Sequence, residues 1–352
     1  MWVNAYYPVY RIGNPAIASL PWNRITHLAY FNISPNAIGT LNNNGGNGDV
    51  TTNMATLVTA AHTNSKKVTI VLGGAGAATD ATWRSAVSST YRATFVSNIV
   101  SFISTWDLDG IDLDWEPFDT ESDGTDFASF VADLRISLPV GKVITMFIAI
   151  QPAWKRTLAN TIEANIDRFN LSTYDLSYGQ TSTMHDAPLY SGGGQPSGAS
   201  AHDAVTNFLA AGVASRKLNI SMSQYTAHWT GSSGLYTTGT FAPGSAEQYD
   251  GLTGATGTTP PTGETYDSTA KGAYIYSGGI FKSYNNLATV QAKVDYVNAN
   301  GLGGIGIWEL GQAYFSGDTP AYPLLEPFNG NLSLGGSVTG MSSITGLATI
   351  TW

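Results

Sequence analysis

The chain has no cysteine and little charge. Without cysteine, disulfides, thiol catalysis and zinc–thiolate sites are all excluded. Charged residues make up 12% of the 352 residues, about half the usual share, so the surface is polar but mostly neutral. The formal net charge is −9, and no run of Lys or Arg occurs. A nucleic acid is therefore not an expected partner, whereas an uncharged polymer would suit this surface.

Long apolar runs are missing too. No stretch of 18 apolar residues occurs, so we expect no membrane partner. The chain begins with strand-like Trp2–Tyr7 rather than with a signal peptide. We expect a secreted (extracellular) protein whose signal sequence has been removed, and we expect it to be a monomer.

Eight short apolar runs rich in β-formers are present. They cover residues 2–7, 25–33, 68–72, 110–115, 143–150, 166–174, 218–225 and 304–308. Helical stripes lie between several of them, for example Tyr91/Phe95/Ile99/Phe102, Phe127/Phe130/Val131/Leu134/Leu138 and Leu287/Val290/Val294/Val297. Strands that alternate with helices indicate parallel βαβ units, and eight such units predict an α/β (β/α)8 TIM barrel. An open doubly wound sheet is the alternative.

Two stretches interrupt this rhythm. Residues 226–270 are rich in Gly, Thr, Ser and Pro and predict a long insertion after the seventh strand, as a cleft wall or a small hairpin subdomain. Residues 329–352 alternate Gly, Ser and Thr with Leu, Val and Ile and predict a short β-rich extension. We therefore expect a catalytic barrel over 1–328 and a C-terminal extension over 329–352.

The segment that carries chemistry places three carboxylates at alternate positions: Asp112, Asp114 and Glu116. Alternate residues of a strand share one face, which in a barrel strand is the interior. Three buried charges there are costly unless protons are shared or a cation is bound. A metal site is disfavoured because the five histidines, His27, His62, His185, His202 and His228, have no ligand spacing. Pairing with structural Arg or Lys remains an alternative.

With Asp109, these acids form a D-x-x-D-x-D-x-E pattern that resembles the signature of glycoside hydrolase family 18, the chitinases. Other segments resemble the family's barrel strands in order: Tyr6-Tyr7-Pro8, residues 26–31, residues 67–74, Thr173-Tyr174-Asp175, Tyr225 and residues 304–309. The chain departs from the family at Val71, where a serine hydroxyl is usual, at Ser172 in place of methionine, and at Pro117-Phe118.

The resemblance implies substrate-assisted hydrolysis with net retention and no protein nucleophile. Glu116 would be the general acid/base, with its pKa held up by burial and a neighbouring carboxylate. Asp114 would bind the acetamide N–H of the sugar, and Asp112 would share a proton with Asp114. Tyr174 would orient the acetamide, and Asp175 would contact the sugar or support the site.

Aromatic residues near predicted strand ends are candidate substrate-binding groups. Trp308, at the end of the eighth strand, suits the flat face of a sugar ring. Tyr7, Tyr225, Trp154, Trp229 and Trp83 are further candidates, and for the three tryptophans a packing role is an equal alternative. No cofactor or metal is expected, because no complete nucleotide-binding or metal motif occurs.

The resemblance implies three candidate functions. The first is a hydrolase that cleaves β-1,4 bonds between N-acetylglucosamine units of chitin or chitooligosaccharides. The second is an endo-β-N-acetylglucosaminidase that cleaves the core of N-glycans. The third is an inactive chitin-binding lectin on the same barrel; it is disfavoured because Glu116 and both inner aspartates are present.

Overall fold

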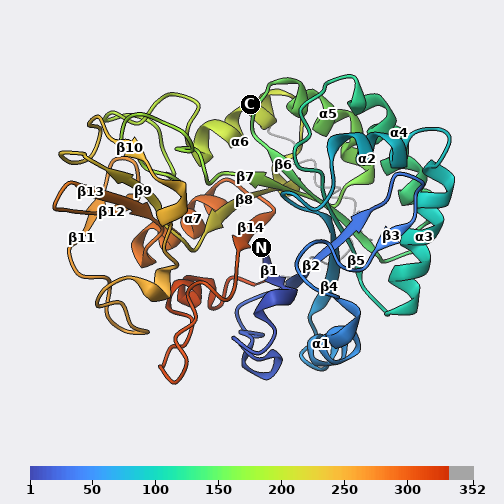
Figure 1. The fold of residues 1–352 in the computed structure, drawn as a ribbon, viewed down its shortest axis with the longest axis horizontal. Helices are drawn as coiled ribbons and strands as arrows, with labels where there is room; N and C mark the ends of the chain where they lie inside the picture. Colours follow the sequence, from blue (N-terminus) through green and yellow to red (C-terminus); the bar gives the residue numbers. More distant parts are fainter. Residues whose placement is uncertain (333–352) are drawn as a thin grey trace, which may run out of the picture.

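The computed structural model of the chain describes residues 1–332, and most of the extension expected over 329–352 lies outside these residues. Eight parallel strands form its centre (Figure 1). They are β1 (Trp2–Pro8), β2 (His27–Pro35), β4 (Lys67–Gly73), β5 (Gly110–Asp114), β6 (Val143–Ala149), β7 (Arg168–Ser172), β8 (Leu218–Ser223) and β14 (Gly304–Trp308). Because β1 pairs with both β2 and β14, the sheet closes into a barrel, as predicted.

Seven α-helices surround the barrel within the described residues: α1 (Thr51–Thr63), α2 (Asp80–Val87), α3 (Arg92–Thr105), α4 (Asp123–Ser137), α5 (Trp154–Ile162), α6 (Ala201–Ala210) and α7 (Leu287–Ala299). The three predicted apolar stripes lie on α3, α4 and α7. The connection from β1 to β2 differs from a full βα unit, since it holds only the short 3-10 helices η1 (Val9–Arg11) and η2 (Ile17–Ser19). None of the helices in residues 1–332 is long and apolar enough to cross a bilayer.

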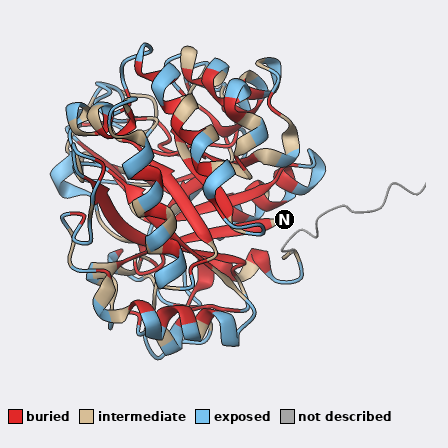
Figure 2. Ribbon diagram, turned by 90° about the vertical axis from the view of Figure 1, so that its right-hand side faces the viewer, coloured by how far each residue is buried: buried red, intermediate tan, exposed pale blue. Residues whose placement is uncertain are grey.

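The strands are buried on both sides, and the two sides differ in chemistry. Figure 2 shows buried strands through the centre and helices whose outer faces are exposed. On β5, Ile111 and Leu113 belong to the large apolar cluster between the strands and the helices. The alternate residues Asp112 and Asp114 point the other way, into the barrel. The period of two therefore separates an apolar layer from an interior that holds polar groups.

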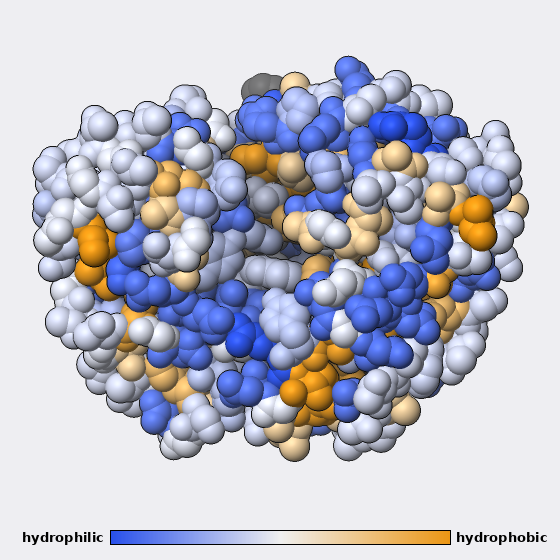
Figure 3. Space-filling view, in the orientation of Figure 1, coloured by the Kyte–Doolittle hydropathy of each residue, from blue (hydrophilic) through white to orange (hydrophobic). Residues whose placement is uncertain are grey.

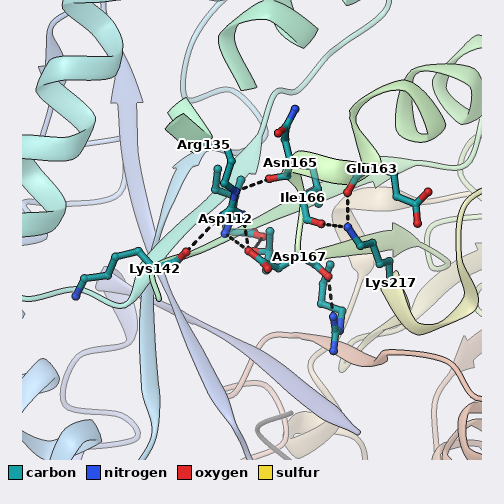
Figure 4. Close-up of polar contacts among 11 residues, drawn as sticks. Asp112, Arg135, Lys142, Glu163, Asn165, Ile166, Asp167 and Lys217 are labelled. Atoms are coloured by element: carbon teal, nitrogen blue, oxygen red, sulfur yellow. Dashed lines mark hydrogen bonds and ion pairs between the residues drawn. The ribbon is translucent and has the colours of Figure 1, made fainter. Parts of the chain in front are cut away.

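The N-terminal ends of the strands are tied by side chains that bond to backbone carbonyls (Figure 4). Arg135 of α4 donates to the carbonyl oxygens of Lys142 and Asn165 and pairs with Asp167 at 2.5 Å. Lys217, just before β8, donates to the carbonyl oxygens of Glu163 and Ile166. These contacts fix the closed end of the barrel and leave the opposite, C-terminal end free for chemistry.

The insertion after β8 is a second sheet. Its strands are β9 (Ala227–Thr230), β10 (Thr240–Phe241), β11 (Glu264–Asp267), β12 (Gly272–Ser277) and β13 (Ile280–Tyr284), all antiparallel. It stands beside the barrel, at the left of Figure 1. The sheet has its own apolar cluster and continues to Tyr284, past the predicted end at residue 270. The composition of residues 226–270 predicted the loops of the insertion. It did not predict the last two strands, β12 and β13, which lie between residue 270 and α7.

Gly73 links the end of β4 to the functional strand β5. Its φ is +106°, and a Cβ there would approach the carbonyl oxygen of Asp114 to 1.9 Å. We expect Gly73→Ala to lower the free energy of unfolding by about 3 kcal/mol or more, from the clash together with left-handed strain. Gly141, with φ +91° and no atom within 4 Å of its Cβ position, is the matched control. Gly141→Ala should cost about 1 kcal/mol; equal losses in urea denaturation would contradict the assignment.

Candidate active site

The three carboxylates of the β5 segment line up from the interior to the mouth of the barrel. Asp112 and Asp114 are buried, and Glu116, two residues past the end of the strand, is half-buried. Asp109 instead faces the opposite end, where it accepts hydrogen bonds from the Val68 N–H and from His62. The structure therefore brings together the three acids expected on one face and separates the fourth acid of the motif from them.

Asp112 is enclosed by donors from three other strands. It accepts hydrogen bonds from Tyr6 Oη of β1 at 2.7 Å, from Thr145 Oγ1 of β6, and from Asn170 Nδ2 of β7 at 3.1 Å. Burial raises the pKa of Asp112 to about 6, and the three donors oppose that rise. Val71 is its register neighbour on β4. Val71 offers no side-chain donor, so the side-chain hydrogen bonds to Asp112 come from β1, β6 and β7.

Asp114 and Glu116 form a coupled pair at the end of β5. Burial raises the pKa of Asp114 well above its usual range, and the charges of Glu116 and Asp112 raise it further. Burial also raises the pKa of Glu116, while the hydrogen bond it shares with Asp114 lowers it. Two carboxyl groups in contact hold one proton between them over a wide pH range. The Oδ1 atom of Asp114 is buried without a hydrogen-bond partner, so it can accept a bond from a ligand.

A cavity of about 250 Å³, which we call the main cavity, opens over this pair. It gathers residues from the C-terminal ends of the barrel strands: Tyr6, Tyr10, Phe31, Asn47, Ala75, Asp114, Glu116, Phe147, Ser172, Tyr174, Asp175, Tyr225 and Trp308. Figure 3 shows this side of the molecule hollowed between the insertion and the barrel, with a largely polar surface. Six of the residues expected from the sequence therefore share one cavity: Asp114, Glu116, Tyr174, Asp175, Tyr225 and Trp308.

The wall next to the insertion is formed by Tyr174, Asp175 and Tyr225. Tyr225 Oη donates to Asp175 Oδ1 at 2.6 Å. Asp175 has a left-handed φ of +56°, and its N–H donates to the buried carboxylate of Asp186 at 3.1 Å. Removal from water raises the pKa of Tyr174 well above its usual range, and the charge of Glu116 adds to this effect. Tyr174 therefore stays a neutral phenol that can donate a hydrogen bond into the cavity.

Trp308 forms an apolar wall of the main cavity. Its ring lies 4.9 Å from that of Phe31 and 5.5 Å from that of Tyr6, measured between centroids. It is half-buried, so part of the indole remains available to a ligand. A flat, partly exposed ring held by two other aromatics is suited to the apolar face of a pyranose.

Two predicted substrate contacts are corrected by the structure. Tyr7 is fully buried between strands and helices, and its Oη donates to the Pro15 carbonyl oxygen at 2.6 Å. Its neighbour Tyr6 is the tyrosine of β1 that faces the cavity. Trp229 is fully buried in the core of the insertion, and its Nε1 donates to the Gln180 carbonyl oxygen at 3.1 Å. Neither side chain can reach a ligand.

The two remaining tryptophans that were predicted as substrate contacts, Trp83 and Trp154, lie outside the main cavity. Trp83 is fully buried and stacks on Trp115, with 5.2 Å between ring centroids. Trp154 is half-buried at the start of α5 and packs its edge on Phe118 at 5.2 Å. Trp83 therefore has the packing role that was the alternative to substrate binding, whereas the substrate contact expected of Trp154 stays a prediction. The structure gives Trp154 no contact with the main cavity.

Several cavity residues were not foreseen from the sequence: Tyr6, Tyr10, Phe31, Asn47 and Phe147. Tyr6, Phe31 and Phe147 lie on barrel strands and could have been found by applying the period of two to β1, β2 and β6 once the direction of each strand was known. Tyr10 lies in the short 3-10 helix η1 and Asn47 on a loop, and neither segment is long enough to show a periodic pattern. Within residues 1–332, no group of three or more His, Cys, Asp or Glu side chains is arranged to hold a metal ion.

Comparison with known proteins agrees with this barrel fold. The sequence model described as "Glycosyl hydrolases family 18" matches residues 3–313. The chain therefore belongs to glycosyl hydrolase family 18.

Individual relatives support the same grouping. Chitotriosidase-1 of Mus musculus is 29% identical over 271 residues, which are 69% of this chain and 58% of the relative. Chitinase C of Streptomyces lividans is 33% identical over 236 residues, 60% of this chain and 36% of the relative. The chain thus spans only part of the length of these relatives. A mutant GH18 chitinase of Cycas revoluta, solved in complex with (GlcNAc)4, has the same fold, with a TM-score of 0.77, 19% identity, and 94% of this chain and 99% of that one covered.

The raised pKa of Asp112 predicts a pH-dependent stability. The pKa of Asp112 is about 6 in the folded chain, against 3.8 for a carboxyl group in the unfolded chain. The folded state therefore holds the proton more tightly. The protonated Asp112 carboxyl therefore makes its full contribution to the free energy of unfolding below pH 3.8. This contribution, about 3 kcal/mol in total, is lost as the pH rises through 6. Asp112→Asn removes this loss, so its stability relative to the wild type should improve by about 2 kcal/mol between pH 4 and 7.

Urea denaturation at pH 4, 5, 6 and 7 measures this difference. Asp107→Asn is the matched control, because Asp107 is exposed and asparagine tolerates its φ of +51°. If the curves of Asp112→Asn and the wild type stay parallel across this pH range, the carboxyl does not hold its proton in the folded state.

Proposed function

We propose that this protein is a retaining glycoside hydrolase that cleaves β-1,4 bonds between N-acetylglucosamine units of chitin or chitooligosaccharides. The observation that supports this most strongly is the coupled Asp114–Glu116 pair at the base of a cavity with an aromatic wall. The (GlcNAc)4 bound by the Cycas revoluta relative supports the substrate class. On this proposal the protein acts outside the cell as a monomer, and neither nucleic acid nor a membrane is its partner.

Glu116 acts as the general acid in the first half of the reaction. It holds a proton because burial raises its pKa, and it lines the cavity where a glycosidic oxygen would lie. The acetamido oxygen of the sugar attacks its own anomeric carbon as the leaving sugar departs, so no protein nucleophile is needed. In the second half, the Glu116 carboxylate takes a proton from water, which attacks from the same face and gives net retention.

Asp114 supports the cyclic oxazolinium intermediate. Its unpartnered Oδ1 accepts the acetamide N–H, and its carboxylate offsets the positive charge that develops there. Because Asp114 and Glu116 hold one proton between them, Asp114 is ionised while Glu116 carries that proton, and Asp112, whose pKa burial raises to about 6, can share its own proton with Asp114.

The remaining cavity residues bind and orient the sugar. Tyr174 donates its hydroxyl to the acetamido oxygen and points it at the anomeric carbon. Asp175, held by Tyr225, contacts the sugar from the insertion side. Trp308 stacks on the apolar face of the ring in the reacting subsite.

Two other functions are separated by one assay. An endo-β-N-acetylglucosaminidase acting on the N-glycan core would use the same acids, and a lectin would use the same cavity. The protein is incubated with colloidal chitin, a chromogenic chitobioside and a high-mannose glycoprotein. We expect turnover of the first two; release of the glycan alone would favour the endoglycosidase, and binding without turnover would favour the lectin.

Glu116→Gln removes the acid and keeps the shape of the side chain. We expect kcat on the chromogenic chitobioside to fall at least ~10³-fold, with sugar affinity retained. Glu121→Gln, the same change at an exposed position five residues later, is the control and should keep full activity. A Glu116→Gln variant as active as the wild type would overturn the assignment of the acid.

Trp308→Ala tests the binding wall. Loss of the stacking surface should weaken (GlcNAc)4 binding about tenfold or more, measured by calorimetry in the Glu116→Gln background so that the sugar stays intact. Trp106→Ala is the control, since Trp106 is also half-buried but caps α3 at the opposite end of the barrel. Equal affinities in the two variants would show that Trp308 does not contact the sugar.

A further inference from the structure

Lys155 occupies an unusual position for a lysine. It lies in the first turn of α5, where the helix dipole disfavours a positive charge, and no acidic residue of that turn offsets it. Its side chain is nonetheless buried, with 4% of the residue exposed. Burying an ammonium group is costly unless it acts on a nearby group of opposite charge.

The side chain of Lys155 makes no ion pair with an Asp or Glu side chain in the described part of the chain. No carboxylate oxygen of residues 1–332 lies within 4.0 Å of its Nζ, which lies 5.6 Å from the centroid of the Trp154 ring. The other buried lysine, Lys293, has its Nζ bonded to the Ala187 carbonyl oxygen and to Asn285 Oδ1. Lys155 thus differs from a structural lysine, whose donors are bonded to fixed acceptors.

The position of Lys155 relative to Glu116 suggests what it does. Lys155 lines a second cavity of about 200 Å³, the side cavity, together with Glu116, Asp119, Phe147 and Ser172. Glu116, Phe147 and Ser172 also line the main cavity, so the two spaces meet at Glu116. Asp114 lines only the main cavity and Lys155 only the side cavity. Glu116 is therefore approached by a carboxyl group through one space and by an ammonium group through the other.

The charged groups that act on Glu116 come from three places in the fold. Asp114 of β5 and Asp175 after β7 are the acids that face it, and Lys155 of α5 is the cation whose charge acts on it. Asp119, in the loop after Glu116, and Asp80 of α2 act on Lys155 in turn. Asp80 is already bonded to Arg84 and to the Trp115 Nε1–H, and Asp119 is exposed to solvent.

We propose that Lys155 is a positioning residue for the catalytic acid: its ammonium group, held in the side cavity, stabilises and orients the Glu116 carboxylate that must accept a proton from water in the second half-reaction. This inference rests on the proposed function. A fixed positive charge behind Glu116 opposes the two acids in front of it, so that the side chain can give up its proton and take it back within one cycle.

The proposal predicts the effect of removing the charge. Without the ammonium group, the pKa of Glu116 rises, and because Asp114 and Glu116 titrate as a pair, both limbs of the pH profile move to higher pH. An ion acting across a hydrated cavity shifts such midpoints by roughly half a pH unit. A lysine that only supported the packing of α5 would change thermal stability and overall rate but not these midpoints.

The test is the pH dependence of kcat/KM on a chromogenic chitobioside for Lys155→Met, Lys155→Gln and Lys155→Arg. Both neutral variants should shift the two midpoints upward by roughly half a pH unit. The arginine variant keeps the positive charge, so its midpoints should stay close to those of the wild type. Lys142→Met is the control: it removes one positive charge at the N-terminal end of β6, far from the cavity, and should leave the profile unchanged. Melting temperatures identify variants that do not fold.

The outcomes distinguish this inference from the proposed function. If the wild type does not turn over any of the sugar substrates, the proposed function fails and this inference fails with it. If the wild type is active but the neutral variants keep its midpoints, only the role of Lys155 is refuted. The same holds if arginine shifts the midpoints as far as methionine does.

Discussion

The burial of three carboxyl groups along one strand face is the constraint on which the rest of the site depends. Asp112, Asp114 and Glu116 point the same way because β5 has a period of two, and the barrel removes the first two from water and partly buries the third. The interior cannot hold three negative charges at this spacing. Donors stabilise Asp112, and a shared proton joins Asp114 to Glu116. The outermost group is left with a proton to give.

This solution requires the closed barrel. The donors to Asp112 come from β1, β6 and β7, which lie far apart in the sequence and meet only because β1 closes the sheet between β2 and β14. The insertion adds a wall through Tyr225 and Asp175, and Trp308 adds the apolar surface. Lys155 acts from the helical layer on the acid itself. Each of these contributions depends on the placement of the three acids.

Periodic features could be predicted from the sequence, and aperiodic ones could not. The eight strands and the stripes of α3, α4 and α7 carry a strong local pattern, and the alternate acids of β5 identified the face of the strand. The prediction that Tyr7, rather than Tyr6, faces the cavity was wrong because the strand is buried on both sides, so the sequence does not show which tyrosine points inward. The prediction that Trp229 binds substrate was wrong because this residue packs against β13, a strand that lies beyond the Gly- and Thr-rich segment 226–270. Lys155 carried no signal, since a lysine early in a helix is usually exposed.

The central claim is tested most directly by titrating the carboxyl groups themselves. Carbon-13 NMR of protein labelled at the Asp and Glu carboxyl carbons, compared with Asp114→Asn and Glu116→Gln variants, isolates the signals of the pair. The account predicts two well-separated steps for Asp114 and Glu116, with the upper step above the usual carboxyl range, and a single step when either partner is replaced. If both groups lose their protons together near pH 4, the usual range for free carboxyls, the pair holds no shared proton and the account is contradicted.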